Sequence, residues 1–287
     1  MNLFLRSAAL LAFAATAACA PVAPPPKATP AAMTASAETL TLKSADGRTV
    51  PVLLVAPAQP LGVVLFSHGG GTPLAGVRPV IDRLVAAGFA VAAPTHTDSL
   101  DQPAETRTTM QDAFPTRVGD MIAVSAFAAQ RFPGLAQAAA GHSYGALTGL
   151  MAGGAFAPMV PAKVDAVKAV VMFSSPGPIP GLSQAPGPLD GVTVPTLLVT
   201  GTADTVPGFV SDPALHLFYF DRLPEGDHTV LIVKGATHEF VAGKEAGFNE
   251  TWALAIDFLK ARIAGDAAAA KRFAAATGGA QVEVRRR

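Results

Sequence analysis

The chain has 287 residues, half of them hydrophobic and only 15% charged. Its 21 basic and 21 acidic side chains give a formal net charge of zero, which excludes a basic field that would attract nucleic acid or acidic lipid. A single cysteine excludes an intramolecular disulfide and a cysteine-based metal cluster. We therefore expect one large domain that is stabilised by burial of its apolar residues, without nucleic acid as a partner and without a metal.

The first residues are typical of an export signal, because a basic residue precedes the apolar stretch 8–15 and small residues follow it. This stretch is shorter than the roughly 20 residues that span a bilayer. We predict a lipoprotein-type signal peptide over residues 1–18 and lipidation of Cys19, since residues 16–19 (TAAC) resemble a bacterial lipoprotein box. Thr16 departs from the usual leucine, and ordinary secretion is the alternative. We expect export to the bacterial periplasm or outer membrane, with the lipid as the only membrane contact.

Composition divides the rest of the chain into three parts. Residues 19–37 are mostly Pro, Ala and Thr, a mixture that cannot bury a core and is typical of a tether. Residues 38–265 carry short apolar runs and helical patterns, and we assign them to the folded domain. Residues 266–287 are rich in alanine and end in basic residues, so we expect a segment that can begin as a helix and that finishes as a frayed, solvated tail.

The pattern within the domain is typical of an α/β fold. Apolar runs at 39–42 and 50–55 flank an Asp46-Gly47 turn and predict an antiparallel hairpin at the leading edge of a sheet. The following short apolar runs alternate with helical stretches, which indicates βα units and a parallel sheet. Strands are predicted at 63–66, 89–93, 136–140, 169–173, 196–200 and 230–233. Helices are predicted at 77–87, at 115–131, from Tyr144 onward and at 239–263.

The strongest functional signal is GHSYG at residues 141–145, a G-x-S-x-G pattern directly after a predicted strand and before a helix-compatible run. A nucleophilic serine needs a sharp turn, with glycines on both sides so that the strand and the helix pass closely. Such a turn lifts the Ser143 hydroxyl clear of the sheet and points a helix N-terminus at the developing negative charge. We predict Ser143 as the nucleophile; an ordinary glycine-flanked turn serine is the alternative.

A serine hydroxyl needs a base to become a nucleophile, and His238 is the histidine best placed for that role. It follows the predicted strand 230–233, on a loop that opens at the same carboxyl edge of a parallel sheet as the Ser143 turn. His96, which also follows a strand, is the alternative. The other histidines are expected to shape a glycine-rich loop (His68) or to be structural or surface residues (His216 and His228).

The third member of such a site is an acid that holds the imidazole in the correct tautomer and stabilises its charged form. Asp204 follows the predicted strand 196–200, and the chain order Ser143, Asp204, His238 is one in which such triads occur. The alternative is that Asp204 caps a turn or helix and Asp212 supplies the carboxylate.

An oxyanion hole requires two backbone N–H groups about 3 Å from the developing charge. The elbow supplies one from Tyr144. The glycine run 69–71 follows a strand and is expected to supply the second from Gly69 or Gly70. A phosphate-binding role for this run is less favoured, because it lacks the Lys-Ser/Thr ending of a P-loop and the G-x-G-x-x-G spacing of a dinucleotide site.

With these residues in place, the chain resembles the α/β-hydrolase superfamily, and within it the dienelactone-hydrolase-like and platelet-activating-factor-acetylhydrolase-like serine esterases. The resemblance runs from about residue 61 to residue 259 and rests on VLFSHG at 64–69, AAP at 92–94 with His96, the elbow at Ser143, PTLLVTGTAD at 195–204 and KGATH at 234–238. It implies an eight-stranded, mostly parallel sheet with helices on both faces, no cofactor, and hydrolysis of an ester or lactone through an acyl-enzyme. The dienelactone hydrolases proper use cysteine where this chain has Ser143.

The expected activity is hydrolysis of a small-molecule ester with a small or short acyl group. The segment 174–194 is rich in Pro and Gly and lacks the amphipathic helix that covers lipase sites, so we expect no large lid. The same triad would serve a lactonase, thioesterase or peptidase. An alternative of another class is a non-catalytic envelope lipoprotein on a hydrolase scaffold.

Overall fold

The structure, a computed structural model, describes residues 35–287. The predicted signal peptide over 1–18, Cys19 and residues 19–34 of the predicted tether lie outside the described residues. Strand β1 begins at Ala35, so residues 35–37 belong to the sheet and not to the tether.

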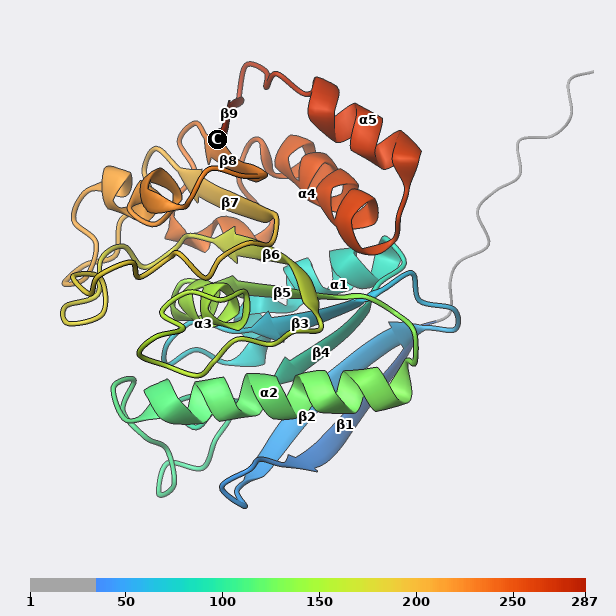
Figure 1. Cartoon of the computed structure of the whole chain (residues 1–287), viewed down its shortest axis with the longest axis vertical. Coiled ribbons are helices and arrows are strands. Elements are labelled where there is room, and N and C mark those ends of the chain that lie inside the picture. The colour runs from blue at the N-terminus through green and yellow to red at the C-terminus, as the bar shows by residue number, and fades with distance from the viewer. Residues whose placement is uncertain (1–34) are drawn as a thin grey trace, which may run out of the picture. The chain divides into compact units, whose positions relative to one another are not determined.

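One continuous sheet runs through the described chain in the order β1-β2-β4-β3-β5-β6-β7-β8-β9, with nine strands where eight were expected (Figure 1). The strands from β4 to β8 in this order are parallel, whereas β1 and β2 at one edge and β9 at the other are antiparallel to their neighbours. The bounds are β1 Ala35–Lys43, β2 Thr49–Pro57, β3 Val63–Ser67, β4 Ala90–Pro94, β5 Gln137–His142, β6 Val167–Phe173, β7 Thr196–Gly201, β8 His228–Val233 and β9 Val282–Arg286.

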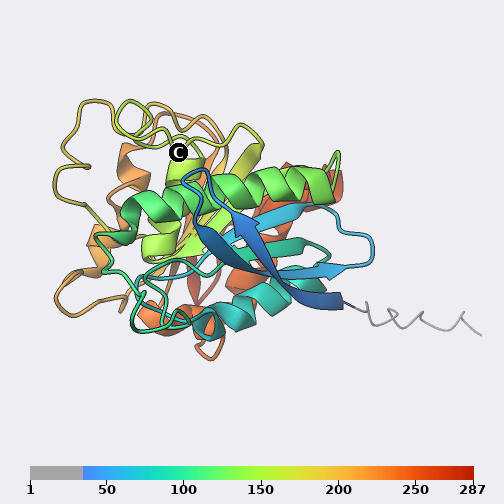
Figure 2. The same cartoon turned by 90° about the horizontal axis from the view of Figure 1, so that it is seen from below.

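Helices cover both faces of the sheet, which explains why its parallel strands are apolar throughout. In β3, Val63 and Leu65 pack into one core, and Val64 and Phe66 pack into the other. Helices α2 and α3 contribute to the first core and α1, α4 and α5 to the second, and Figure 2 shows α2 and α1 on opposite sides. The helices are α1 Arg78–Ala86, α2 Ala113–Arg131, α3 Tyr144–Ala152, α4 Phe248–Ile263 and α5 Ala267–Ala275, with 3₁₀ turns η1 Leu74–Val77, η2 Pro213–Leu217, η3 Phe220–Arg222 and η4 His238–Ala242.

The predicted hairpin, the six predicted parallel strands and the first three predicted helices are confirmed, with ends that differ by a few residues. The single helix predicted at 239–263 is wrong, because this segment forms η4 and then α4. Gly243 and Gly247 separate the two elements with φ angles of 78° and 79°, which no α-helix contains. The break leaves His238 on a short turn directly after β8.

The predicted frayed end of the segment 266–287 is also wrong, whereas its helical beginning is present. The Asp266 carboxylate accepts hydrogen bonds from Ala268 N and Ala269 N and so begins α5. Strand β9 then pairs with β8 and closes that edge of the sheet, and the Val282 side chain packs into the second core with 2% of its surface exposed. The C-terminal segment is therefore part of the fold.

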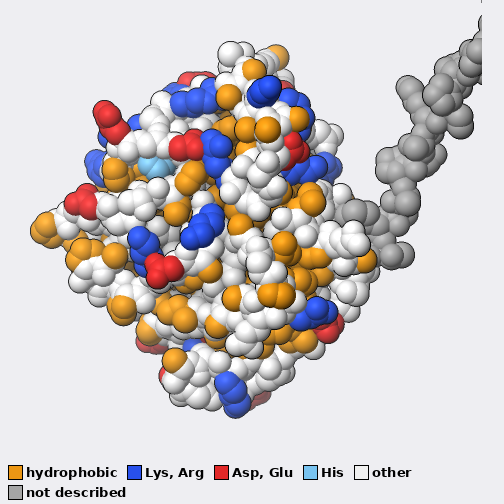
Figure 3. Space-filling view, turned by 45° about the vertical axis from the view of Figure 1, so that its right-hand side comes forward, with side chains coloured by type: hydrophobic (Ala, Val, Ile, Leu, Met, Phe, Trp, Pro, Cys, Tyr) orange, Lys and Arg blue, Asp and Glu red, His pale blue; other side chains and the backbone are white. Residues whose placement is uncertain are grey.

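The surface agrees with the balanced charge of the sequence. On the face shown in Figure 3, acidic and basic side chains lie interspersed among hydrophobic ones. Within residues 35–287, no helix combines the length and the apolar character needed to cross a membrane.

Candidate active site

Ser143 lies on the turn that joins β5 to α3, with backbone angles of φ 55° and ψ −119°. A positive φ strains a residue that carries a side chain, and such strain is typical of functional turns. Glycine is required on both sides, because a Cβ at Gly145 would overlap the Ser67 carbonyl oxygen and a Cβ at Gly141 would overlap the Gly145 carbonyl. The predicted elbow is therefore present, and Ser143 is half-buried at the carboxyl edge of the sheet.

His238 and Asp204 are in direct contact. His238 Nδ1 donates to Asp204 Oδ1 at 2.8 Å, and the other oxygen of this buried carboxylate accepts from Thr200 Oγ1 at 3.0 Å. Burial by itself raises the pKa of Asp204, but hydrogen bonds from His216 and His238 outweigh it and hold the pKa below its usual range. The ionised carboxylate selects the His238 tautomer in which Nε2 is free to take a proton.

His142, which precedes Ser143, holds the His238 backbone next to the serine turn. His142 Nε2 donates to the His238 carbonyl oxygen at 3.0 Å, and the two ring centroids are 4.6 Å apart. Burial lowers the pKa of His142 to about 3, so this ring stays neutral. Within residues 35–287 no hydrogen bond joins Ser143 Oγ to His238 Nε2; such bonds often tighten only when substrate binds.

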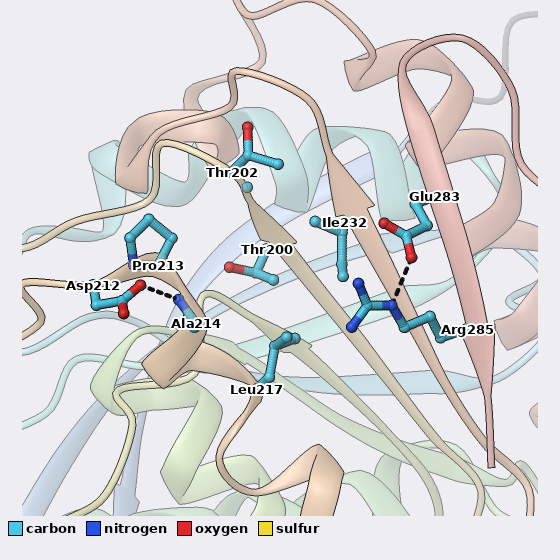
Figure 4. Close-up of a pocket in the computed structure, with 10 residues that line it drawn as sticks. Thr200, Thr202, Asp212, Pro213, Ala214, Leu217, Ile232, Glu283 and Arg285 are labelled. Carbon is cyan, nitrogen blue, oxygen red and sulfur yellow. Dashed lines mark hydrogen bonds and ion pairs between the residues drawn. The ribbon is translucent and has the colours of Figure 1, made fainter.

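Asp212, the alternative acid, does not contact His238. Its Oδ1 accepts from Ala214 N at 2.9 Å and caps η2. Asp212 lines a cavity of about 290 Å³ near the ends of β7 and β8, which the ion pair of Glu283 and Arg285 also lines (Figure 4). Neither the predicted nucleophile nor the predicted base lines this cavity. The structure therefore favours Asp204 as the acid.

The predicted oxyanion donors lie next to one another. A Cβ added to Gly69 would lie 3.3 Å from His142 Nδ1, and one added to Gly70 would lie 3.4 Å from Tyr144 Cδ1, so the glycine-rich loop packs against the elbow. Among the described residues, the backbone N–H groups of Tyr144, Gly69 and Gly70 have no hydrogen-bond acceptor. The geometry thus leaves both glycines as candidates for the second donor.

A buried arginine holds the glycine-rich loop in place. Arg117, on α2, donates to two carbonyl oxygens of the loop at 2.8 and 2.9 Å. It also forms a bidentate pair with Asp98 at 3.0 and 2.8 Å, and Asp98 in turn accepts from Gly71 N at 3.0 Å. The guanidinium lies 4.5 Å from the Tyr144 ring centroid. One charge pair therefore ties α2 to the loop and to the elbow.

His96, the alternative base, belongs to a separate network. Its Nε2 contacts Ser67 Oγ at 2.9 Å and its Nδ1 contacts Asp120 Oδ2 at 2.8 Å. This order of groups repeats that of a catalytic triad, but all three residues are fully buried. Burial lowers the pKa of His96 and raises that of Asp120 to about 6. His68 accepts from His96 N at 3.1 Å, so this network supports the loop that His68 was expected to shape.

His216 lies closer to the site than the sequence indicated. It is fully buried, its Nε2 is 2.9 Å from Asp204 Oδ1, and its ring stacks on that of His238 with centroids 5.8 Å apart. Asp204, His216 and His238 offer donor atoms within 4.8 Å of one another, as in a metal site, but one ring nitrogen of each histidine contacts Asp204 Oδ1 directly. We therefore describe the cluster as hydrogen-bonded.

Sequence reasoning missed Arg117 and His216 for different reasons. Arg117 and Asp120 lie on the same face of α2 as the buried Met121 and Val124. A charged residue at a core position of an amphipathic helix indicates a buried partner, so this signal was available. His216 lies on η2, in the irregular connection between β7 and β8, where no periodic pattern marks a buried position.

Comparison with known proteins shows the family and the fold. The model of the dienelactone hydrolase family matches residues 50–273. Among solved structures, the Pyrococcus furiosus esterase Pf2001 is similar at 16% identity over 79% of this chain and 91% of that chain, with a TM-score of 0.61. A cold-adapted esterase from an Arctic intertidal metagenomic library is similar at 18% identity over 80% and 94%, with a TM-score of 0.57. No curated protein gives a significant match. At these identities the structural likeness shows a shared fold alone.

Proposed function

The chain belongs to the dienelactone hydrolase family, and we propose that it is a serine hydrolase that cleaves small or short-acyl carboxylic esters through an acyl-enzyme intermediate. The observation that carries the proposal is the 2.8 Å hydrogen bond from His238 Nδ1 to the buried Asp204 carboxylate, beside the strained Ser143 turn. This arrangement is a base with one free nitrogen, an acid that orients it, and a serine lifted from the sheet. The names of the two similar esterases support the same class of reaction.

The proposed mechanism uses each of these groups once in each half of the reaction. His238 Nε2 takes the Ser143 hydroxyl proton while Oγ attacks the ester carbonyl carbon. The resulting oxyanion accepts from Tyr144 N and from Gly69 N or Gly70 N, and each such donor is worth about 3 kcal/mol of barrier. The imidazolium then gives its proton to the leaving alcohol. Water attacks the acyl-enzyme by the same route and returns Ser143 to its free form.

The proposed preference for short acyl groups follows from the connection between β6 and β7. Residues 174–195 contain no helix or strand in the structure. An apolar helix over the site is the usual means by which long acyl chains are covered, and this connection provides none. We therefore propose an open site that takes small esters.

Substitution of the nucleophile tests this function. Ser143→Ala is expected to lose about 10⁶-fold in turnover of p-nitrophenyl acetate, because the nucleophile of a triad is removed. Labelling of the wild-type protein by a fluorophosphonate, absent in the variant, would identify the reactive serine. Ser125→Ala is the matched control, since the Ser125 hydroxyl lies on α2 and bonds to Gln137 Oε1 at 2.7 Å. Turnover near the wild-type level in pure Ser143→Ala would show that the proposal is wrong.

A further inference from the structure

His216 is held between groups that only accept hydrogen bonds. Its Nδ1 contacts the carbonyl oxygen of Ser175. Its Nε2 lies 3.1 Å from the Asp204 carbonyl oxygen and 2.9 Å from Asp204 Oδ1. A carbonyl oxygen cannot donate, and the ionised Asp204 carboxylate cannot donate either. Both ring nitrogens therefore need a hydrogen, which only the imidazolium form provides.

The burial of His216 makes the alternative costly. The side chain is fully buried, so a neutral ring would set a nitrogen lone pair against an oxygen lone pair where water cannot intervene. Although burial lowers the pKa of this histidine, its hydrogen bond to Asp204 and the charge of that carboxylate raise the pKa above the ordinary value. Both the hydrogen-bond geometry and the neighbouring negative charge thus favour the protonated form of His216.

The other groups around His216 add no second negative charge. Within the described chain, Asp204 is its only ion-pair partner. The His238 ring stacks against it with an interplanar angle of 22°, and His142, which contacts His238 from the other side, is neutral. The Asp204 carboxylate therefore accepts a hydrogen bond from each of two imidazoles. His216 keeps its proton, whereas His238 takes up and releases a proton during the proposed reaction.

We propose that His216 is an imidazolium that shares the Asp204 carboxylate with His238, and that its positive charge keeps the enzyme active at lower pH. His216 is a positioning residue: it acts on the reaction through Asp204 and through its charge beside His238. The effect on activity rests on the proposed function. The protonation state of His216 does not.

The first test reads the protonation state directly. In ¹⁵N-labelled full-length protein, the His216 ring signals are assigned as those that disappear in His216→Gln. Both nitrogens are expected to carry hydrogen at pH 7.5, where an ordinary imidazole with a pKa of about 6.5 is mostly neutral. Asp204→Asn is expected to return His216 to a neutral tautomer at this pH, because the charged partner is lost. A neutral His216 in the wild-type protein overturns the proposal, whether or not the protein hydrolyses esters.

The second test reads the pH profile of ester hydrolysis. In His216→Gln a positive charge beside the site is lost, so the acid limb of kcat/KM is expected to move to higher pH. A unit charge at 5.8 Å, with an effective dielectric constant of about 20, corresponds to a shift of about two pH units. His216→Asn, a smaller amide donor, serves as the second variant if His216→Gln does not fold.

The control is His228→Gln, which removes a buried histidine that bonds to Thr196 Oγ1 at 3.0 Å away from the site. Its acid limb is expected to match that of the wild-type protein. An unchanged acid limb in folded His216→Gln contradicts the proposal. Absence of hydrolysis in the wild-type protein contradicts the proposed function instead, and the nitrogen signals then decide the state of His216.

Discussion

At the scale of single residues, Asp204 is the point at which the buried contacts of the site converge. Its Oδ1 accepts from His238 and from His216, and its Oδ2 accepts from Thr200. In Asp204→Asn the amide no longer stabilises the imidazolium and favours the wrong tautomer of His238. We predict a loss of up to about 10⁴-fold in kcat for p-nitrophenyl acetate, with the fold retained.

Asp212→Asn is the control for this prediction. Asp212 caps η2 through Ala214 N and touches neither histidine of the site, so kcat is expected to stay close to the wild-type value. If Asp212→Asn were the inactive variant and Asp204→Asn the active one, the acid would have been assigned wrongly.

The sequence predicted the three members of this site because each directly follows an apolar strand. In a parallel sheet the carboxyl ends of the strands share one edge, so residues that directly follow different strands lie close together in the fold. The structure brings Ser143, Asp204 and His238 to that edge. No such rule applies to His216, whose contact with Asp204 depends on how an irregular connection folds back.

At the scale of elements, β9 makes a prediction about stability. It pairs with β8 over five residue pairs and buries Val282 in the second core. Deletion of residues 282–287 exposes the β8 edge and removes this apolar contact. We expect the free energy of unfolding, measured by urea denaturation, to fall by about 3 kcal/mol or more.

The double variant Glu283→Ala, Arg285→Ala is the control for the deletion. It keeps the backbone pairing and removes only an exposed ion pair, which is worth about 0.5 kcal/mol. Equal stability of the deleted and the full-length chain would mean that β9 does not support the sheet.

Strand β9 was not predicted because the composition of the C-terminal segment obscured its alternation of apolar and charged residues. Val282 and Val284 alternate with Glu283 and Arg285, but the strand is short and follows an alanine-rich segment that is typical of a solvated end. The helix break before α4 was more visible. Glycine is a common residue at helix ends, and in the structure Gly243 ends η4 and Gly247 precedes α4.

At the scale of the whole molecule, the open connection between β6 and β7 predicts the substrate profile. With no helix in residues 174–195, this connection offers no amphipathic helix to cover a fatty acyl chain. We expect kcat/KM for p-nitrophenyl esters to decline from butyrate to palmitate. A steady rise along that series would contradict the proposed short-acyl preference.

The buried Arg117–Asp98 pair has a consequence for the response of the protein to salt. Both side chains are only 1% exposed, so dissolved ions cannot approach the pair that fixes the glycine-rich loop. The exposed pair of Arg78 and Asp82, by contrast, stands in water and is screened as ionic strength rises. High salt therefore weakens the surface electrostatics of the molecule much more than the electrostatics that shape its reaction centre.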